Sequence, residues 1–304
     1  MKENHKAGFV ALVGRPNTGK STLINALVGE KIAIISDKPQ TTRSLIRGIV
    51  SKQDYQILIV DTPGIHKPKT TLGSRLNELS KEAIGDVDLI AMCFPADQKI
   101  GPGDQFIMDQ IKHARKPAFA LVTKSDLVSK NALLEKLNEV ATVSEISWTE
   151  IIPISSVSKE NIKTLEEKIV EYLPDSPALY PKELITDQDF ERRVSELIRE
   201  AALQGLTEEL PHSVAVLIDE VFEADSKKGK ILKIFASIFV ERDSQKSIII
   251  GAQGARLKAV GTKARGEIEA IAGQKVFLDL RVKVASDWQS DTKLLSKLGF
   301  DQYN

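Results

Sequence analysis

Residues 14–21, Gly-Arg-Pro-Asn-Thr-Gly-Lys-Ser, constrain the fold of this chain more than any other segment. They follow an apolar run over residues 9–13 and precede a predicted helix over residues 21–27. A glycine-rich loop between a strand and a helix turns backbone N–H groups toward a phosphate, at a helix end that already favours anions. A chance match would lack this strand and helix context. The segment therefore predicts a nucleotide-binding α/β domain.

Two side chains of this loop carry the expected chemistry. Lys20 places a positive charge at the outer phosphates. Ser21 offers a hydroxyl to Mg²⁺, which prefers hard oxygen ligands. The residues of the loop that we expect to bind the nucleotide are Gly14, Asn17, Thr18, Gly19, Lys20, Ser21 and Thr22.

A second apolar run, residues 55–60, ends at Asp61-Thr62-Pro63-Gly64. Open α/β sheets build their ligand sites at the carboxyl ends of strands, so we expect Asp61 to serve as a Mg²⁺ carboxylate. Gly64 has no Cβ, and its amide is expected to contact a terminal phosphate. The alternative is an ordinary turn, since Pro and Gly are strong turn formers.

Residues 123–126, Thr-Lys-Ser-Asp, follow the strand-like run 118–122. The Asp126 carboxylate can accept hydrogen bonds from guanine N1–H and the exocyclic amine, whereas adenine presents an acceptor at N1. The motif therefore predicts selection of guanine. Lys124 is expected to lie along the base. After the run 151–154, Ser155 and Ser156 can offer backbone N–H to guanine O6, although paired serines also form ordinary loops.

Together these motifs resemble the five ordered motifs of translation-factor-like GTPases, over about the first half of the chain. Thr123 stands where that family usually has Asn, which is expected to weaken loop anchoring or a base contact without changing the choice of guanine. Ser156 stands where Ala is usual, and we expect that change to be tolerated. The residue after Gly64 is Ile65, where many GTPases carry a water-orienting glutamine, so slow intrinsic hydrolysis is expected.

Residues 39–43, Pro-Gln-Thr-Thr-Arg, lie between the two phosphate loops. Either Thr41 or Thr42 can meet Mg²⁺ and the γ-phosphate, and we favour Thr42; a solvated loop threonine is the alternative. Asn17 resembles the asparagine that holds K⁺ in some GTPases of this branch, or it satisfies the backbone of its own turn. The expected catalytic residues are Lys20, Thr42 and Gly64, and the expected Mg²⁺ ligands are Ser21, Thr42 and Asp61.

Composition indicates a globular chain. It has 304 residues, 42% hydrophobic and 28% charged, with a formal net charge of zero, and this length suits two domains. The start is polar and no apolar run approaches the ~20 residues of a membrane span, so a cytoplasmic location is expected. Cys93, the single cysteine, lies in an apolar run and is expected to be buried and inert.

Short apolar runs alternate with helical patterns up to about residue 173, which predicts a mostly parallel sheet with helices on both faces. The clearest predicted helices cover residues 72–84, 103–111, 131–146 and 159–172. Prolines 174, 177 and 181 then predict a linker. We therefore expect a GTP-binding domain over 1–174, a Pro-rich linker over 175–186 and a second domain over 187–304.

The second domain shows an amphipathic helix over 187–205, strands over 213–222 and 230–241, a helix from about 261 to 272 and a strand over 275–284. Gly251 and Gly254 form a GxxG sequence between these elements. Five cations and no acidic residue lie between residues 245 and 266: Lys246, Arg256, Lys258, Lys263 and Arg265.

This α-β-β-α-α-β order with its GxxG loop resembles an α+β type II KH domain, here with a C-terminal helix. The glycine loop of such domains clamps a single-stranded nucleic-acid backbone. The RNA-binding residues implied by the resemblance are Gly251, Ala252, Gln253, Gly254, Arg256 and Lys258. Since Ala252 and Gln253 are not basic, phosphate attraction must come from flanking residues. The alternative is a solvated helix face behind a tight turn.

A GTPase domain of this branch, a short linker and a type II KH domain resemble the Era family over nearly the whole chain. The resemblance implies a monomeric GTP- and Mg²⁺-dependent GTPase, with K⁺ as a possible further ion. It implies binding to the 3′ end of small-subunit (16S) rRNA, assistance to 30S subunit assembly and peripheral association with the inner face of the cell membrane. GTP would order the loops around Thr42 and Gly64 and change the exposure of the GxxG surface.

Two alternative functions can each be distinguished from RNA binding by one observation. A signalling GTPase whose C-terminal domain binds a protein would show little of the salt dependence that phosphate contacts give to RNA binding. An ATP-using P-loop kinase is disfavoured by Asp126, which accepts from guanine.

Overall fold

The computed structural model describes residues 5–35, 45–63, 70–143, 146–206, 213–226 and 229–300. The chain divides into two compact units, with the main boundary between Asp187 and Gln188. Among the described residues, no helix combines the length and the apolar character needed to cross a membrane.

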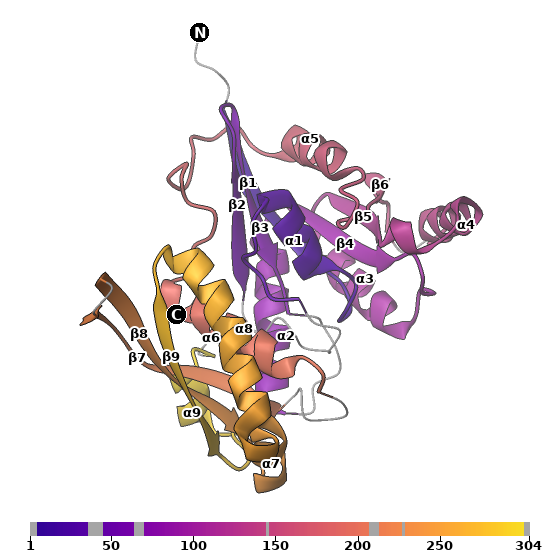
Figure 1. Ribbon diagram of the computed structural model, residues 1–304. Coiled ribbons are helices and arrows are strands. Elements are labelled where there is room, and N and C mark those ends of the chain that lie inside the picture. Colours follow the sequence, from indigo (N-terminus) through magenta and orange to yellow (C-terminus); the bar gives the residue numbers. More distant parts are fainter. Residues whose placement is uncertain are drawn as a thin grey trace. The chain divides into compact units, whose positions relative to one another are not determined.

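A six-stranded sheet forms the centre of the first unit, in the strand order β2-β3-β1-β4-β5-β6 (Figure 1). All neighbouring strands are parallel except β2, which runs antiparallel to β3. The strands are β1 (Lys6–Val13), β2 (Ile46–Ser51), β3 (Tyr55–Asp61), β4 (Leu89–Pro95), β5 (Ala118–Thr123) and β6 (Glu150–Pro153). The central strands are buried on both faces, as parallel strands covered by helices require.

Helices cover both faces of this sheet. Their bounds are α1 (Lys20–Val28), α2 (Thr71–Gly85), α3 (Pro102–Ala114), α4 (Lys130–Ala141) and α5 (Ile162–Tyr172), with a short 3₁₀ turn η1 (Ser125–Leu127). Side chains of α1 and α5 share one hydrophobic core with the sheet, and side chains of α2, α3 and α4 share the other. The predicted α/β architecture is confirmed, and Cys93 is buried inside it.

Three details of the first unit differ from the sequence prediction. The helix predicted over 131–146 ends at Ala141. The helix predicted over 159–172 begins only at Ile162, because Lys159 and Asn161 adopt left-handed backbone angles. β2 was not predicted, since Gly48 interrupts its apolar pattern. A Cβ at Gly48 would lie 2.8 Å from side-chain atoms of Ile24 and Val28 in α1, so the close approach of strand and helix requires glycine there.

The proline-rich segment is fastened to the first unit. Buried Gln56 of β3 accepts hydrogen bonds from the N–H groups of Leu179 and Tyr180, at 2.8 and 2.9 Å, and donates to the Tyr180 carbonyl at 2.9 Å. Further on, the Ile49 N–H of β2 donates to the Ile185 carbonyl at 2.9 Å. The segment predicted as a linker therefore follows the surface of the first unit.

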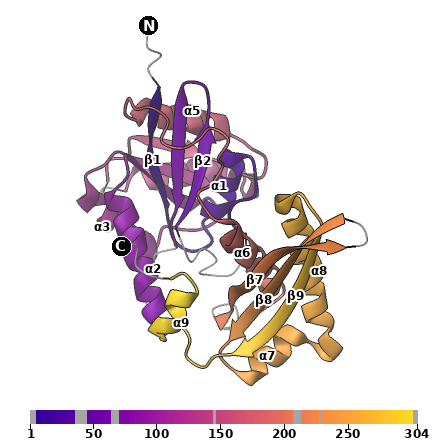
Figure 2. The same ribbon diagram turned by 90° about the vertical axis from the view of Figure 1, so that its left-hand side faces the viewer.

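The second unit packs three helices on one face of a three-stranded sheet, β7-β8-β9. β7 and β8 are antiparallel, whereas β8 and β9 are parallel. The elements are α6 (Phe190–Leu203), β7 (Ala215–Ser226), β8 (Gly229–Val240), α7 (Asp243–Ile250), η3 (Ala252–Gly254), α8 (Ala255–Ala272), β9 (Val276–Val284) and α9 (Thr292–Lys297). Figure 2 shows the three strands in front of α6 and α8.

The predicted α-β-β-α-α-β order is confirmed by these elements. The last long helix differs from the prediction, because α8 begins at Ala255 rather than near residue 261. The left-handed backbone of Gly254 ends the GxxG turn, and the helix starts directly behind it. Gly261 inside α8 concealed this early start in the sequence.

We predict that Gln56→Leu destabilises the first unit. The change removes the donor and the acceptor of the Gln56 amide and leaves backbone groups of Leu179 and Tyr180 without these hydrogen bonds, at a cost of about 3 kcal/mol. Urea unfolding measures the loss. Limited proteolysis should then cut the variant between residues 178 and 183 faster than the wild type.

Gln53→Leu is the matched control, because Gln53 is exposed in the turn before β3. Equal stability of the Gln56→Leu protein and this control would contradict a fastening role for Gln56.

Candidate functional site

The loop between β1 and α1 has the backbone shape of an anion-binding nest. Asn17 and Gly19 have left-handed φ angles of 64° and 93°. Gly19 is the N-cap of α1, so the loop delivers its N–H groups at the start of a helix. Successive amides turned inward at a helix N-terminus bind anions through both hydrogen bonds and the helix dipole. The loop expected to bind phosphate therefore has the backbone for it.

Lys20 lies inside this loop rather than in solvent. It is 5% exposed, and its Nζ donates to the carbonyls of Gly14 at 3.0 Å and Arg15 at 2.9 Å. Burial lowers the pKa of Lys20 from its ordinary value, and the nearby Asp61 carboxylate opposes that shift. Two carbonyl oxygens thus hold a buried ammonium at the centre of the phosphate loop.

Ser21 and Asp61 meet where β3 ends beside the start of α1. The Ser21 hydroxyl donates to Asp61 Oδ2 at 2.8 Å, and Asp61 is fully buried. A hydroxyl and a carboxylate beside a phosphate loop form the kind of oxygen donor set that Mg²⁺ takes, with phosphate and water completing its shell. The residues present fit this ion. Thr42 and Gly64, the other residues predicted for this site, lie outside the described residues, as does Thr41.

Thr123 joins the base-reading loop to the phosphate loop. Its hydroxyl donates to the Thr18 carbonyl at 2.6 Å and lies 3.3 Å from the Phe94 carbonyl. Thr123 and Thr18 are both buried. We expected threonine at this position to weaken either this anchoring or a base contact. The hydroxyl makes a direct anchoring contact across the two loops.

Lys124 and Asp126 follow this anchor. Lys124 has a left-handed backbone with φ 57° and begins the turn η1, in which Asp126 is exposed. The neighbouring serine loop is more constrained. Ser155 is fully buried, its N–H donates to the Glu160 carbonyl at 3.3 Å, and its hydroxyl accepts from the Ser158 N–H at 3.1 Å. The amide of Ser155 therefore serves its own turn, and Ser156 follows it, half-buried.

Arg15 makes a contact that sequence reasoning missed. Its Nε donates to Asp104 Oδ1 at 2.8 Å, and the side chain of Asp104, in the first turn of α3, is 1% exposed. The other oxygen of Asp104 accepts from the Gly101 N–H at 2.9 Å. This ion pair ties the phosphate loop to the start of α3. Two signals in the sequence were available: an arginine inside the loop and an aspartate in the first turn after Gly-Pro-Gly.

The GxxG loop in the second unit connects α7 and α8. Gly251 and Gly254 have φ angles of 73° and 77°, and Gln253 is also left-handed at 51°. A Cβ at Gly251 would lie 2.7 Å from the Cβ of Arg256, so the turn closes too tightly for any other residue. Ala252 and Gln253 are exposed at its tip.

The cations behind this loop fall into two groups. The guanidinium of Arg256 donates to the carbonyls of Gln204 at 2.7 Å and Ala202 at 3.3 Å, at the C-terminal end of α6. Lys263 donates to the side chain of Gln204 at 2.9 Å. By contrast, the side chain of Lys258 is exposed near the loop. Of the two cations predicted to bind RNA, Arg256 is engaged with its own protein and Lys258 faces solvent.

Two family models match the chain. A model described as a 50S ribosome-binding GTPase matches residues 9–124, and a KH domain model matches residues 209–289. The first match includes the phosphate loop, Asp61 and Lys124, and the second includes the GxxG loop.

Two curated relatives extend this similarity over the full length. A protein named GTPase Era from Nocardioides sp. (strain ATCC BAA-499 / JS614) is 51% identical, covering 97% of this chain and 96% of its own length. GTPase Era from Mycolicibacterium smegmatis (strain ATCC 700084 / mc(2)155) is 52% identical, covering 97% and 99% respectively.

Two solved structures share the architecture. A crystal structure of Era with MgGDPNP and nucleotides 1506–1542 of 16S ribosomal RNA superposes with a TM-score of 0.93 at 37% identity, covering 98% of this chain and all of that one. An Era variant from Aquifex aeolicus bound to GDP and AlF₄⁻ gives a TM-score of 0.92 at 36% identity, with the same coverage. With its nucleotide loops, its KH unit and relatives at half identity over nearly its whole length, this chain belongs to the Era family of GTPases.

Proposed function

We propose that this GTPase is a GTP- and Mg²⁺-dependent switch that binds the 3′ end of small-subunit (16S) rRNA and assists assembly of the 30S subunit. One observation carries the proposal: a phosphate loop with a buried lysine and a GxxG loop with an exposed lysine behind it occur in one chain. A relative at 37% identity holds a GTP analogue and a 16S rRNA segment in a single crystal structure.

In this proposal, each residue of the phosphate site has a distinct role. Lys20 neutralises charge on the outer phosphates, because its ammonium is already held at the centre of the loop. Ser21 and Asp61 hold Mg²⁺, with Thr42 as a further ligand. The amides of Gly14, Thr18, Gly19 and Thr22 and the amide of Gly64 contact phosphates, and Asn17 can hold K⁺ in place of an arginine. When bound, Mg²⁺ supplies charge stabilisation for phosphoryl transfer.

Hydrolysis in this site depends on positioning and charge. Phosphoryl transfer needs little covalent chemistry from the protein, and Lys20 and the loop amides supply the positive potential. Ile65 stands where many GTPases place a water-orienting glutamine, so the chain alone is expected to turn over slowly.

Guanine recognition is assigned to the loop after β5. Asp126 accepts from guanine N1–H and the exocyclic amine, and Lys124 lies along the base. Thr123 holds this loop to the phosphate loop through Thr18. Because the amide of Ser155 serves its own turn, the Ser156 amide is the better donor to guanine O6.

RNA binding is assigned to the GxxG loop and to Lys258 behind it. Gly251, Ala252, Gln253 and Gly254 approach the RNA backbone, and Lys258 supplies charge. Arg256 positions the loop from behind, through α6. From the sequence pattern we further propose domains over 1–174 and 187–304, a linker over 175–186 and a cytoplasmic location. The family resemblance adds a monomeric state and peripheral membrane association to the proposal.

The RNA assignment predicts a selective effect of Lys258→Gln. With an RNA matching the 16S rRNA 3′ end, the variant should bind more weakly, and the slope of log affinity against log salt should fall by about 0.7, the value for one lost single-strand phosphate contact. Fluorescence anisotropy in a salt series, with GTP analogue and with GDP, measures both quantities.

Lys163→Gln is the matched control, since Lys163 is exposed on α5 in the other unit. Gly254→Asp should abolish selective binding relative to a scrambled RNA. Salt-insensitive wild-type binding, equal for both RNAs, would refute the assignment and favour a protein-binding GTPase.

Asp126→Asn is predicted to lose guanine preference. The amide would direct donors at the donor groups of guanine, so GTP affinity should fall by about 100-fold or more, while xanthosine triphosphate gains a partner for its extra carbonyl. Competition against a fluorescent nucleotide measures the ratio. Asp109→Asn on the exposed side of α3 is the control, and an unchanged preference for GTP would rule out the role of Asp126.

Thr123→Val is predicted to weaken nucleotide binding by about tenfold, because the buried Thr18 carbonyl loses its donor at a cost of about 1 to 3 kcal/mol. Thr123→Ser retains the hydroxyl and should bind like the wild type. Titration calorimetry with GDP compares the two. Equal loss in both variants would show that the methyl group, not the hydroxyl, matters.

A further inference from the structure

β7 forms one edge of the three-stranded sheet in the second unit. Its inner side pairs with β8, and among the described residues no strand pairs with its outer side. An uncovered strand edge presents N–H and C=O groups that another extended chain can pair with.

An aromatic cluster lies on the outer face of the sheet beside this edge. It consists of Phe222 of β7, Phe235 of β8 and Phe277 of β9. The ring centroid of Phe235 is 6.1 Å from each of the other two. Phe222 and Phe277 remain 38% and 47% exposed. Clustered exposed aromatic rings are typical of the centre of a protein interface.

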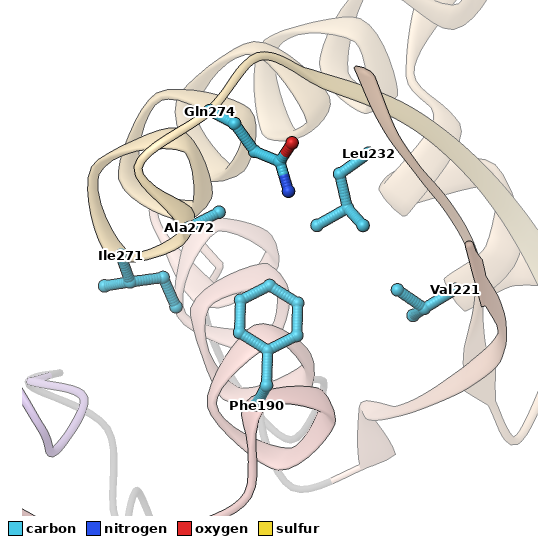
Figure 3. A pocket seen from close by; sticks show the side chains of 6 residues that line it. All are labelled: Phe190, Val221, Leu232, Ile271, Ala272 and Gln274. Carbon is cyan, nitrogen blue, oxygen red and sulfur yellow. The ribbon is translucent and has the colours of Figure 1, made fainter. Parts of the chain in front are cut away.

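A pocket lies on the opposite face of the same strands. It has a volume of about 300 Å³ and is lined by Phe190, Val221, Leu232, Ile271, Ala272 and Gln274. Figure 3 shows the side chains of α6, α8 and the two strands converging on this space. Five of the six lining residues are apolar, and Gln274 adds polar atoms to the lining, so the pocket can take a side chain with an apolar body and a polar end.

The pocket and the aromatic cluster are reached from one strand. Val221 and Phe222 are consecutive in β7, and consecutive strand residues point to opposite faces of a sheet. A segment added along the β7 edge would likewise alternate, with one side chain toward the pocket and the next toward the rings. Strand addition combines main-chain hydrogen bonds with such alternating side-chain contacts.

The charge of β7 indicates which class of partner this edge can bind. The strand carries Asp219, Glu220, Glu223 and Asp225 and no cation. Lys230 of β8 lies 3.2 Å from Glu223, and Lys283 of β9 lies 3.7 Å from Asp219. Glu220 forms no ion pair among the described residues. One cation, Lys233 of β8, lies 5.8 Å from the centroid of the Phe222 ring. The strand at the edge carries only acidic charge, so this edge favours a polypeptide with Lys and Arg side chains over RNA.

We propose that the β7 edge binds an extended segment of a small-subunit ribosomal protein, one that alternates apolar and basic side chains. The inference rests on the proposed function, which brings this GTPase to the small subunit. This second binding surface lies near the C-terminal end of α8, whereas the GxxG loop lies at its N-terminal end. The 18 residues of α8 separate the two ends by about 27 Å.

The test compares purified small subunits with protein-free small-subunit rRNA as probes for the full-length protein. The double variant Phe222→Ser/Phe277→Ser loses the aromatic centre of the interface, and Glu220→Lys loses its charge complementarity. Each variant should bind small subunits about tenfold more weakly than the wild type. Their affinity for protein-free rRNA should equal that of the wild type. Hydrogen exchange of the β7 amides should slow on small subunits and not on rRNA.

Glu135→Lys on α4 is the control for charge reversal, since Glu135 is exposed in the other unit. Unchanged binding of both β7 variants to small subunits would overturn the inference. Equal losses on protein-free rRNA would also overturn it, because the surface would then contact RNA. A wild type that binds neither probe would refute the proposed function itself.

Discussion

A buried ammonium group organises the nucleotide site. Lys20 is almost fully enclosed, and a cation removed from water needs oxygen atoms close by. The carbonyls of Gly14 and Arg15 supply them, which requires the chain to curl back over the lysine between β1 and α1. In the same loop, Asn17 and Gly19 have the left-handed backbone angles of an anion-binding nest. The same constraint therefore supplies both the cationic centre and the ring of N–H donors that a triphosphate needs.

Buried polar contacts then set the other loops relative to this centre. Thr123 ties the end of β5 to Thr18, and Asp104 ties the start of α3 to Arg15. Each contact contributes only about 1 kcal/mol net, yet leaving one partner unsatisfied costs more. The sheet brings the strand ends to one edge, but these contacts determine how the loops meet there. At this position the hydroxyl of Thr123 makes the connection across the loops.

Features of the fold that depend on neighbouring residues could be predicted from the sequence. The strand, loop and helix around Lys20 were predictable, because glycine spacing and apolar runs are visible in consecutive residues. β2 was missed, since its glycine reflects an approach to α1 across the sheet. The start of α8 was misplaced because Gly261 resembles a helix breaker in sequence while it lies inside the helix. The contacts of Arg15 and Arg256 join residues far apart in the chain, and no pattern of neighbouring residues encodes them.

Folding also changes what the basic cluster behind the GxxG loop can bind. In sequence, Arg256, Lys258 and Lys263 are equivalent positive charges. In the fold, Arg256 and Lys263 reach the C-terminal end of α6, where the helix dipole and the last carbonyls favour cations. Lys258 is exposed beside the loop. Arg256 and Lys263 stay positively charged, because their partners are neutral oxygen atoms, but the guanidinium of Arg256 already donates to its own protein. Direct contacts to phosphate are therefore expected from Lys258 before Arg256.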